Sequence, residues 1–368
     1  MQDFVLAHAV DGSARDLATA CADVIGRAPG HRLGFVYATS SLAPAFASVV
    51  AQLRERTGIE HWVGTVGHGI CATGTDYFDQ PAVVAMACAI EPTDYRLIAS
   101  KSAEDAAKAA RGAPFMAAIG VVHGDPRHED VTSLIAALGQ GSGAYLVGGL
   151  TSADRVFPQV AGSTTLDGGV SGVLLGGRNV QVAVGLTQGC SPIGPSHTIT
   201  SLQGQVLVTL DDEPAFEVLR RDVGAGSDAD PRRWLADIHA AIPVSGSDRA
   251  DYVVRNIVGI GPEEGLVAIA DNLDLGDRVM FVRRDAEAAD RDLQRMLGEL
   301  KARTRTPPKA GLYYSCLARG PNLFAEAAHE MRAIEQAFDD IPIVGFFGNG
   351  EIAHDRLYGY TGVLTLFS

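Results

Sequence analysis

Three stretches of the chain repeat one order of features, and this internal repeat constrains the fold more than any other property of the sequence. Each stretch combines an apolar strand-like run, a segment with apolar residues at helical spacing, a second run, a glycine-rich turn and a final strand-like run. Strand-helix-strand units are common, so chance likeness is the alternative interpretation. The same Val-Gly dipeptide in the second run of all three repeats argues against chance likeness. It occurs at Val63-Gly64, Val147-Gly148 and Val344-Gly345.

The segment between the second and third repeats has a different pattern. Residues 197–210 alternate like a hairpin, 213–221 are typical of a short helix, and 252–284 hold three strand-like runs. We therefore predict an α/β fold in which repeated strand-helix-strand-strand units form mixed sheets, in two intimately packed halves. We expect the third repeat to pack back on the first two, because the segment before it is so different.

Composition excludes several classes of function. The chain has 368 residues, 46% of them hydrophobic, which predicts a folded globular protein. Its 30 basic and 44 acidic residues give a net charge of −14, which disfavours nucleic acid and an anionic membrane surface as partners. There is no apolar run of membrane-spanning length, no secretory signal pattern and no CxxC pair among the five cysteines. We therefore expect a cytoplasmic protein with reduced thiols.

The carboxyl end of the strands in the third repeat is the richest candidate ligand site. Parallel strands of a crossover unit end at one edge of the sheet, where ligands of open α/β sheets bind. The first strand of this repeat ends at Cys316 and is followed by Arg319 and by a helix predicted from Pro321 to Phe338. The second strand ends in Gly348-Asn349-Gly350-Glu351. A cation near a helix start is disfavoured by the helix dipole, so Arg319 needs an anionic partner. Two partners stay open, a ligand carboxylate or an ion pair with Glu351.

The other two repeats offer weaker candidates at the equivalent edge, and no catalytic template fits. The candidates are His68 in the first repeat and His123, Thr151 and Ser152 in the second. The sequence lacks the GxSxG, HExxH and GxxxxGK[ST] patterns and has no metal-ligand spacing, so we predict no catalytic residue and no metal site. A cysteine nucleophile would pair Cys71 with His68 or Cys316 with His354, but neither pairing is a specific signal for catalysis.

At these glycine-rich strands the sequence resembles the FIST family. The resemblance is carried by residues 316–320, by the run from Pro342 to Ile352, by residues 197–216, and by residues 33–187 with Trp62-Val63-Gly64. It implies a FIST N-terminal region over residues 1–195 and a FIST C-terminal region over 196–368. One departure is that Gly69 is followed by Ile70, where relatives often have a glutamate, so a site in the first repeat would be altered or absent.

The resemblance implies a bacterial sensory protein that binds a small molecule such as an amino acid or another small carboxylate. Relatives are often fused to kinase or cyclic-dinucleotide domains, so this chain is expected to signal through a separate protein of that kind. Some relatives bind haem and respond to nitric oxide, which makes a haem-based gas sensor the first alternative, with His68 and His123 as axial candidates. The second alternative is a cryptic cysteine-dependent hydrolase. The leading hypothesis places the ligand at these residues: Cys316, Arg319, Gly348, Asn349, Gly350, Glu351, His68, Thr151 and Ser152.

Overall fold

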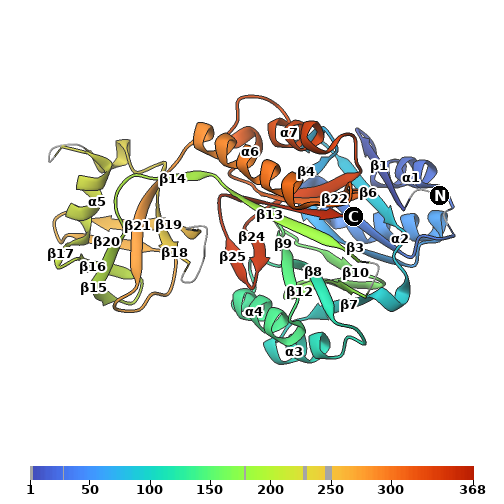
Figure 1. Ribbon diagram of the computed structural model, residues 1–368, viewed down its shortest axis with the longest axis horizontal. Helices are drawn as coiled ribbons and strands as arrows, with labels where there is room; N and C mark the ends of the chain where they lie inside the picture. The colour runs from blue at the N-terminus through green and yellow to red at the C-terminus, as the bar shows by residue number, and fades with distance from the viewer. Residues whose placement is uncertain (1–2, 28, 178–179, 227–229, 245–250) are drawn as a thin grey trace. The chain divides into compact units, whose positions relative to one another are not determined.

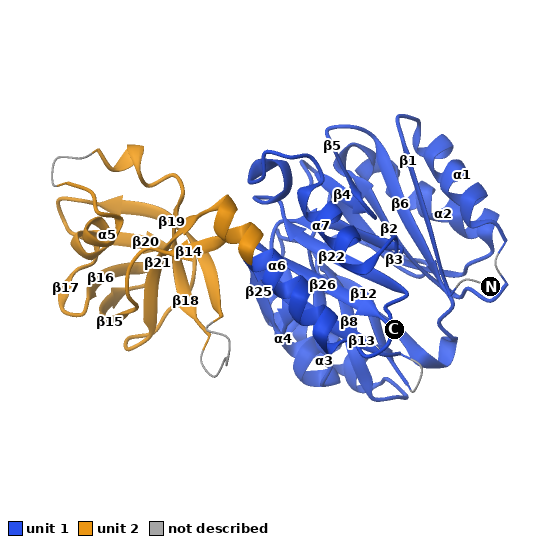
Figure 2. Ribbon diagram, turned by 45° about the horizontal axis from the view of Figure 1, so that its top comes forward, with its two compact units in different colours: residues 1–188, 292–368 blue, residues 189–291 orange. Residues whose placement is uncertain are grey.

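The chain forms two compact units in the computed structural model (Figure 2). The structure describes residues 3–27, 29–177, 180–226, 230–244 and 251–368. Unit 1 comprises residues 1–188 and 292–368, and unit 2 comprises residues 189–291. Among the described residues, no helix is both long enough and apolar enough to cross a membrane.

Unit 1 contains all three predicted repeats, and each is larger than the sequence suggested. Every repeat has the order strand, helix, strand, helix, strand, two-stranded hairpin and strand. The first repeat consists of β1 (Phe4–Val10), α1 (Ala14–Ile25), β2 (Leu33–Thr39), α2 (Phe46–Thr57), β3 (His61–Gly67), β4 (Gly69–Ala72), β5 (Thr75–Phe78) and β6 (Ala82–Cys88). The second consists of β7 (Tyr95–Ser100), α3 (Ala103–Arg111), β8 (Ala117–Gly124), α4 (Val131–Ser142), β9 (Tyr145–Leu150), β10 (Gln159–Ala161), β11 (Thr164–Leu166) and β12 (Val170–Gly176).

Unit 2 is inserted into the third repeat after its first strand, and it includes residues 286–291, the beginning of the first helix of that repeat. This repeat consists of β13 (Val182–Gln188), α6 (Ala286–Arg303), β22 (Ala310–Cys316), α7 (His329–Phe338), β23 (Ile343–Gly348), β24 (Glu351–His354), β25 (Arg356–Tyr358) and β26 (Thr361–Phe367). The predicted helix from Pro321 was too long, because Ala328 adopts a left-handed conformation with φ 53° and α7 begins only at His329. The interruption separates the end of β22 from the helix that follows it.

The three repeats exchange their hairpins cyclically. The sheet orders are β1-β6-β2-β3-β10-β11, β7-β12-β8-β9-β24-β25 and β13-β26-β22-β23-β4-β5. Thus the first repeat's hairpin joins the third sheet, the second repeat's hairpin joins the first sheet, and the third repeat's hairpin joins the second sheet. The mixed sheets and the packing of the third repeat on the first two are therefore confirmed.

The glycine of each Val-Gly dipeptide faces the backbone of the neighbouring parallel strand in its repeat. Val36 pairs with Gly64, Val122 with Gly148 and Tyr313 with Gly345. A Cβ atom on these glycines would lie 1.7, 1.8 and 1.6 Å, respectively, from the carbonyl oxygen of the paired residue. Only glycine fits there, since a side-chain carbon needs about 3.5 Å from a neighbouring atom. The sequence signal for the repeat is thus a packing requirement.

Each sheet is covered by its own pair of helices on one face (Figure 1), and the other faces meet in the interior. On the first parallel strand of each repeat, one residue pairs with the glycine, and the side chain of the next residue points into this interior. These residues are Tyr37, His123 and Tyr314, which we call the central cluster. The Tyr37 hydroxyl lies 3.2 Å from His123 Nε2 and 2.8 Å from the Tyr314 hydroxyl, and all three side chains are buried. Phe346 stacks on Tyr37 with ring centroids 5.3 Å apart.

Unit 2 is a strongly bent antiparallel sheet around its own apolar core. The sheet closes on itself, because β21 pairs with both β15 and β18. The hairpin predicted over residues 197–210 and the three runs predicted over 252–284 are confirmed. The elements of unit 2 are β14 (Cys190–Pro192), β15 (His197–Gln203), β16 (Val206–Leu210), β17 (Glu213–Pro214), α5 (Ala215–Val223), β18 (Ile238–Pro243), β19 (Tyr252–Gly261), β20 (Leu266–Ile269) and β21 (Arg278–Arg284).

Candidate functional site

The carboxyl ends of the three pairs of parallel strands are tied to one another. The Ser152 hydroxyl donates a hydrogen bond to the Phe347 carbonyl at 2.5 Å and accepts one from the His68 backbone N–H at 2.9 Å. The Asn349 N–H donates to the Leu150 carbonyl at 2.9 Å. The structure therefore brings together one predicted candidate from each repeat, His68, Ser152 and Asn349, and the three edges can be compared at equivalent positions.

The edge of the third repeat contains a buried ion pair between Arg319 and Glu330. Arg319 Nε donates to Glu330 Oε1 at 2.8 Å, and Arg319 Nη2 lies 2.8 Å from the same oxygen. The carboxylate also accepts hydrogen bonds from the hydroxyls of Tyr313 and Ser315 and from the Gly320 N–H. Burial acts to lower the pKa of Arg319, but Glu330 beside it raises that pKa overall. The guanidinium is thus a fixed buried cation.

Glu351 lies at the same edge on β24 and is fully buried. Its Oε2 accepts hydrogen bonds from the Thr361 N–H at 3.1 Å and from the Thr361 hydroxyl at 2.7 Å. Burial raises the pKa of Glu351 to about 8, although Thr361, Arg319 and Cys316 each act to lower it. Glu351 is therefore mostly a neutral carboxylic acid at pH 7.

Three buried polar atoms at this edge have no hydrogen-bond partner among the described residues. They are Nη1 and Nη2 of Arg319 and Oε1 of Glu351. The short approach of Nη2 to Glu330 does not have the direction of a hydrogen bond, so it contributes attraction without satisfying that donor. An unsatisfied buried polar group costs about 1–3 kcal/mol, and more when it is charged. Two donor nitrogens and one carboxyl oxygen thus have unused hydrogen-bonding capacity at this edge.

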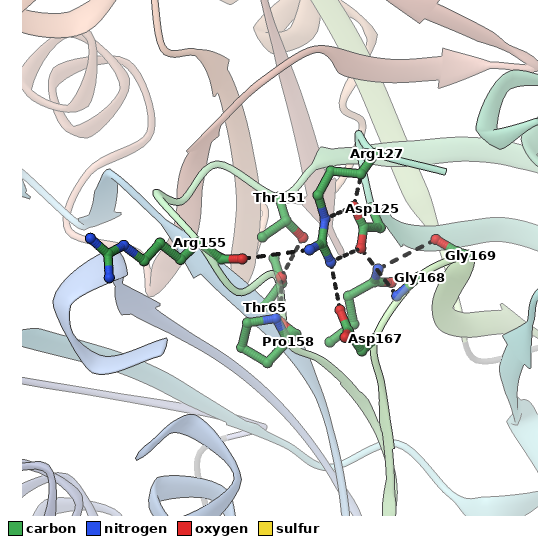
Figure 3. A network of polar contacts seen from close by, with 10 residues as sticks. Thr65, Asp125, Arg127, Thr151, Arg155, Pro158, Asp167, Gly168 and Gly169 are labelled. Carbon is green, nitrogen blue, oxygen red and sulfur yellow. Dashed lines mark hydrogen bonds and ion pairs between the residues drawn. The ribbon is translucent and has the colours of Figure 1, made fainter. Parts of the chain in front are cut away.

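The edge of the second repeat is different, because its cation is saturated by protein groups (Figure 3). Asp125 accepts hydrogen bonds from the backbone N–H, Nε and Nη2 of Arg127 and from the Gly168 N–H. Nη2 of Arg127 also contacts Asp167 at 2.6 Å, and the guanidinium lies 4.4 Å from the centroid of the Phe157 ring. Although burial acts to raise it, the pKa of Asp125 is lowered overall, mainly by Arg127. Each guanidinium nitrogen of Arg127 thus has a protein partner, although the side chain is 47% exposed.

Each exchanged hairpin has one residue equivalent to Glu351, which pairs with the residue that follows the glycine of a Val-Gly dipeptide. Phe346 pairs with Ile70, Thr65 with Gln159 and Gly149 with Glu351. The first repeat thus has an apolar side chain here, and the second has a neutral amide with one unpartnered oxygen. The expectation that Ile70 alters the first-repeat site is consistent with this equivalence. Only the third repeat combines an acid at this position with an incompletely bonded arginine among the described residues.

The remaining predicted residues have different exposures. Thr151 and Ser152 are buried, and the Thr151 hydroxyl lies 2.7 Å from that of Thr65. Asn349 is exposed, whereas Gly348, Gly350 and Cys316 are buried. Gly350 has a φ of 128°, a conformation that residues with a side chain rarely adopt.

Glu330 was not among the site residues predicted from the sequence. Arg319 pairs with this residue and not with Glu351, so the predicted Arg319–Glu351 ion pair is replaced by another. Glu330 is the second residue of α7, where an acid suits the helix dipole, and an acid at a helix start is the sequence signal that was available. The position was hidden because the helix was predicted to begin at Pro321.

Neither haem nor cysteine chemistry fits the residues proposed for them. His123 Nε2 faces Tyr37, and the ring is packed against Tyr37, Phe346 and Tyr314 at centroid distances of 5.5, 5.8 and 6.3 Å. Burial lowers the pKa of His123 to about 3, but the packed rings leave no slot for a porphyrin. The His68 side chain is 33% exposed between Ser40 and Asp154, which is a polar turn and not an apolar haem pocket.

The two candidate thiols are held in their neutral form. Burial raises the pKa values of Cys71 and Cys316 well above the range of a reactive thiolate. The Cys71 Sγ faces the Tyr313 carbonyl and not His68, and the ring of His354 contacts Asp355 and Tyr145. The hydrolase alternative therefore has no activated nucleophile in these two cysteines.

Comparison with known proteins gives two family matches and several relatives. Residues 32–213 match the sequence model of the FIST N domain, and residues 215–354 match that of the FIST C domain. An uncharacterized protein of Mycobacterium tuberculosis is 32% identical over 241 residues, which is 61% of this chain and 61% of that protein. An uncharacterized protein of Mycobacterium bovis is 31% identical over 242 residues, again 61% of each chain. The matched segment thus spans less than two thirds of the length of these relatives.

Proposed function

This chain belongs to the FIST family, and from that premise we propose that it is a sensory protein whose small ligand binds beside Arg319 and Glu351. FIST domains are sensory domains that bind small ligands. The observation that carries the proposed position is the set of unpartnered buried atoms, Nη1 and Nη2 of Arg319 and Oε1 of Glu351. The saturated edge around Arg127 supports the assignment by contrast.

The chemistry of these atoms favours an amino acid or another small carboxylate. A guanidinium with two free N–H-bearing nitrogens suits a carboxylate, which it holds by paired charge-assisted hydrogen bonds. Glu351 suits an ammonium group when it is ionised and an acceptor or hydroxyl when it is neutral. Arg319 is buried and the centroid of the Phe324 ring lies 5.6 Å from its Cζ atom, so entry of the ligand requires the segment 320–328 to move.

We expect one ligand class in a panel of amino acids and small carboxylates to raise the unfolding temperature of the purified chain. A ligand at a hundredfold excess over its Kd stabilises the native state by about 2.7 kcal/mol. Glu351→Gln and Arg319→Lys should each reduce the affinity at least about tenfold, because each alters one of the two proposed contacts. Thermal shift and titration calorimetry measure both effects.

Arg127→Lys is the matched control for this experiment, because it makes the same substitution at the equivalent edge of the second repeat. Its ligand affinity should stay within about twofold of the wild type, whatever it does to stability. Equal loss of affinity in Arg127→Lys and Arg319→Lys would contradict the proposed position. Absence of a shift with every compound would remove support for this ligand class.

The pH dependence of binding separates the two ligand classes. An amino acid needs ionised Glu351, whose pKa burial raises to about 8, so binding releases a proton below that pH. Its affinity should therefore rise by up to about tenfold per pH unit between about pH 6 and 8 and then level off. A carboxylate without an ammonium group leaves Glu351 neutral, so its affinity should be flat in this range and fall above about pH 8. Calorimetry in buffers of different ionisation enthalpy counts the proton, and Glu351→Gln should abolish the pH dependence.

The signalling partner is also part of the proposal. The family resemblance suggests a separate kinase or cyclic-dinucleotide enzyme, and we also propose a cytoplasmic location. A sensory protein of this kind needs a surface that such a partner can recognise.

A further inference from the structure

The region between the ends of α6 and α7 contains a surface pocket of about 330 Å³. Both helices pack on the same face of the third sheet, through the apolar cluster that includes Leu297, Leu300 and Ile334. The apolar part of the pocket wall is formed by Pro307, Pro308, Ala337, Phe338 and Ile341, and its polar part by Lys301, Thr304, Arg305 and Asp339.

The basic residues at the rim of this pocket differ in their contacts from the other basic residues of the same stretch of chain. Residues 295–309 contain five basic side chains, and three of them are engaged. Arg295 contacts Asp292 and Glu299, Arg303 donates to the Val184 carbonyl, and Lys309 pairs with Asp3. The other two are Lys301 and Arg305, which are exposed and have no side-chain partner among the described residues. These two unpaired cations line the pocket together with one exposed acid, Asp339, so the rim has a net charge of +1.

The helix dipole explains only part of this arrangement. Cations near a helix C-terminus gain about 0.3–1 kcal/mol, which accounts for the sign of Lys301 and Arg305. It does not account for an apolar hollow beside them, or for two free cations in a chain whose net charge is −14. An apolar pocket within a charged rim has the anatomy of an interface anchor, in which one large side chain is desolvated and the rim selects charge.

We propose that this pocket is a docking site for an acidic segment of a separate protein, which inserts one aromatic or large aliphatic side chain. The volume lies at the lower end of ligand pockets, which span about 300–1,000 Å³, and therefore suits a single anchor. Acidic residues flanking the anchor pair with Lys301 and Arg305, while the rest of the acidic surface repels other approaches. This inference does not rest on the ligand site and stands even if no ligand binds at Arg319.

The test uses the full chain and a fluorescein-labelled peptide in which one tryptophan is flanked on each side by two glutamates. Fluorescence anisotropy should show saturable binding that weakens with added salt. The double variant Lys301→Glu, Arg305→Glu should lose at least about tenfold in affinity, since two rim contacts are exchanged for repulsion. Ala337→Phe, which fills the pocket, should reduce affinity similarly, with circular dichroism confirming that each variant is folded.

The matched control is Lys108→Glu, Arg111→Glu, which makes the same charge change in the last turn of α3. Both control residues are exposed, and this variant should bind within about twofold of the wild type. A peptide with lysines in place of the glutamates should not bind. Unchanged affinity in the rim variant, or no binding by the wild type at about 1 mM peptide, would overturn the proposal. Binding of N-acetyltryptophan as tight as that of the peptide would overturn it too, because the pocket would then be a small-molecule site.

Discussion

Replacing Gly345 with alanine is expected to destabilise unit 1 by about 4 kcal/mol or more, at the upper end of single-substitution effects. The new Cβ would lie 1.6 Å from the Tyr313 carbonyl oxygen, which is backbone and has no rotamer by which to move away. Relief requires β22 and β23 to separate, and these strands carry Arg319 and the exchanged hairpin with Glu351 at their carboxyl ends. The substitution should therefore disturb the candidate ligand site as well as the hydrophobic core of unit 1.

The chain contains a control for this substitution and a reporter for each unit. Gly298 lies in α6 and is exposed, with no atom within 4 Å of an added Cβ, so Gly298→Ala should stabilise by up to about 1 kcal/mol. Trp62 lies in unit 1 and Trp234 in unit 2, so a Trp234→Phe background lets fluorescence follow urea unfolding of unit 1 alone. A Gly345→Ala variant that unfolds within about 1 kcal/mol of its background would mean that the strand spacing is not fixed as described.

The sequence allowed the repeat to be predicted, because its signals are local. Strand-like runs, helical spacing and the Val-Gly dipeptide each lie within a few residues, and the dipeptide reflects a contact that only glycine permits. The cyclic exchange of hairpins was not predictable in this way. It depends on the sheet edge with which each hairpin pairs. The residue patterns of β4, β10 and β24 do not identify their partner strands.

The candidate site was predictable in part for the same reason. Arg319 and Glu351 follow strand ends, so the edge rule located them without a structure. The partner of Arg319 was not predicted, because Glu330 lies eleven positions further along the chain. In addition, the left-handed conformation of Ala328 makes the helix begin later than predicted. The contrast between Arg127 and Arg319 was likewise out of reach, since it depends on how many hydrogen bonds each guanidinium completes in three dimensions.

The second large effect concerns the pair that fixes Arg319. Glu330→Gln keeps the shape of the side chain but removes the charge that compensates the buried guanidinium, which is 0% exposed. Breaking a buried pair by removing one partner costs about 3–5 kcal/mol, because a charge is left uncompensated. We expect a loss of this size in the same Trp234→Phe background, measured by urea unfolding.

A second substitution distinguishes an uncompensated charge from simple loss of hydrogen bonds. In the double variant Arg319→Met, Glu330→Gln the buried charge is gone, and the glutamine oxygen can still accept from Ser315 or the Gly320 N–H. This variant should be more stable than Glu330→Gln alone by about 1–3 kcal/mol, although it carries one more change. If adding Arg319→Met instead lowers stability further, the cost at Glu330 arises from its hydroxyl and backbone partners and not from the cation. If the double variant is folded and has lost the ligand affinity that Glu330→Gln alone and Arg127→Lys both retain, the same experiment assigns Arg319 to the ligand independently of its structural role.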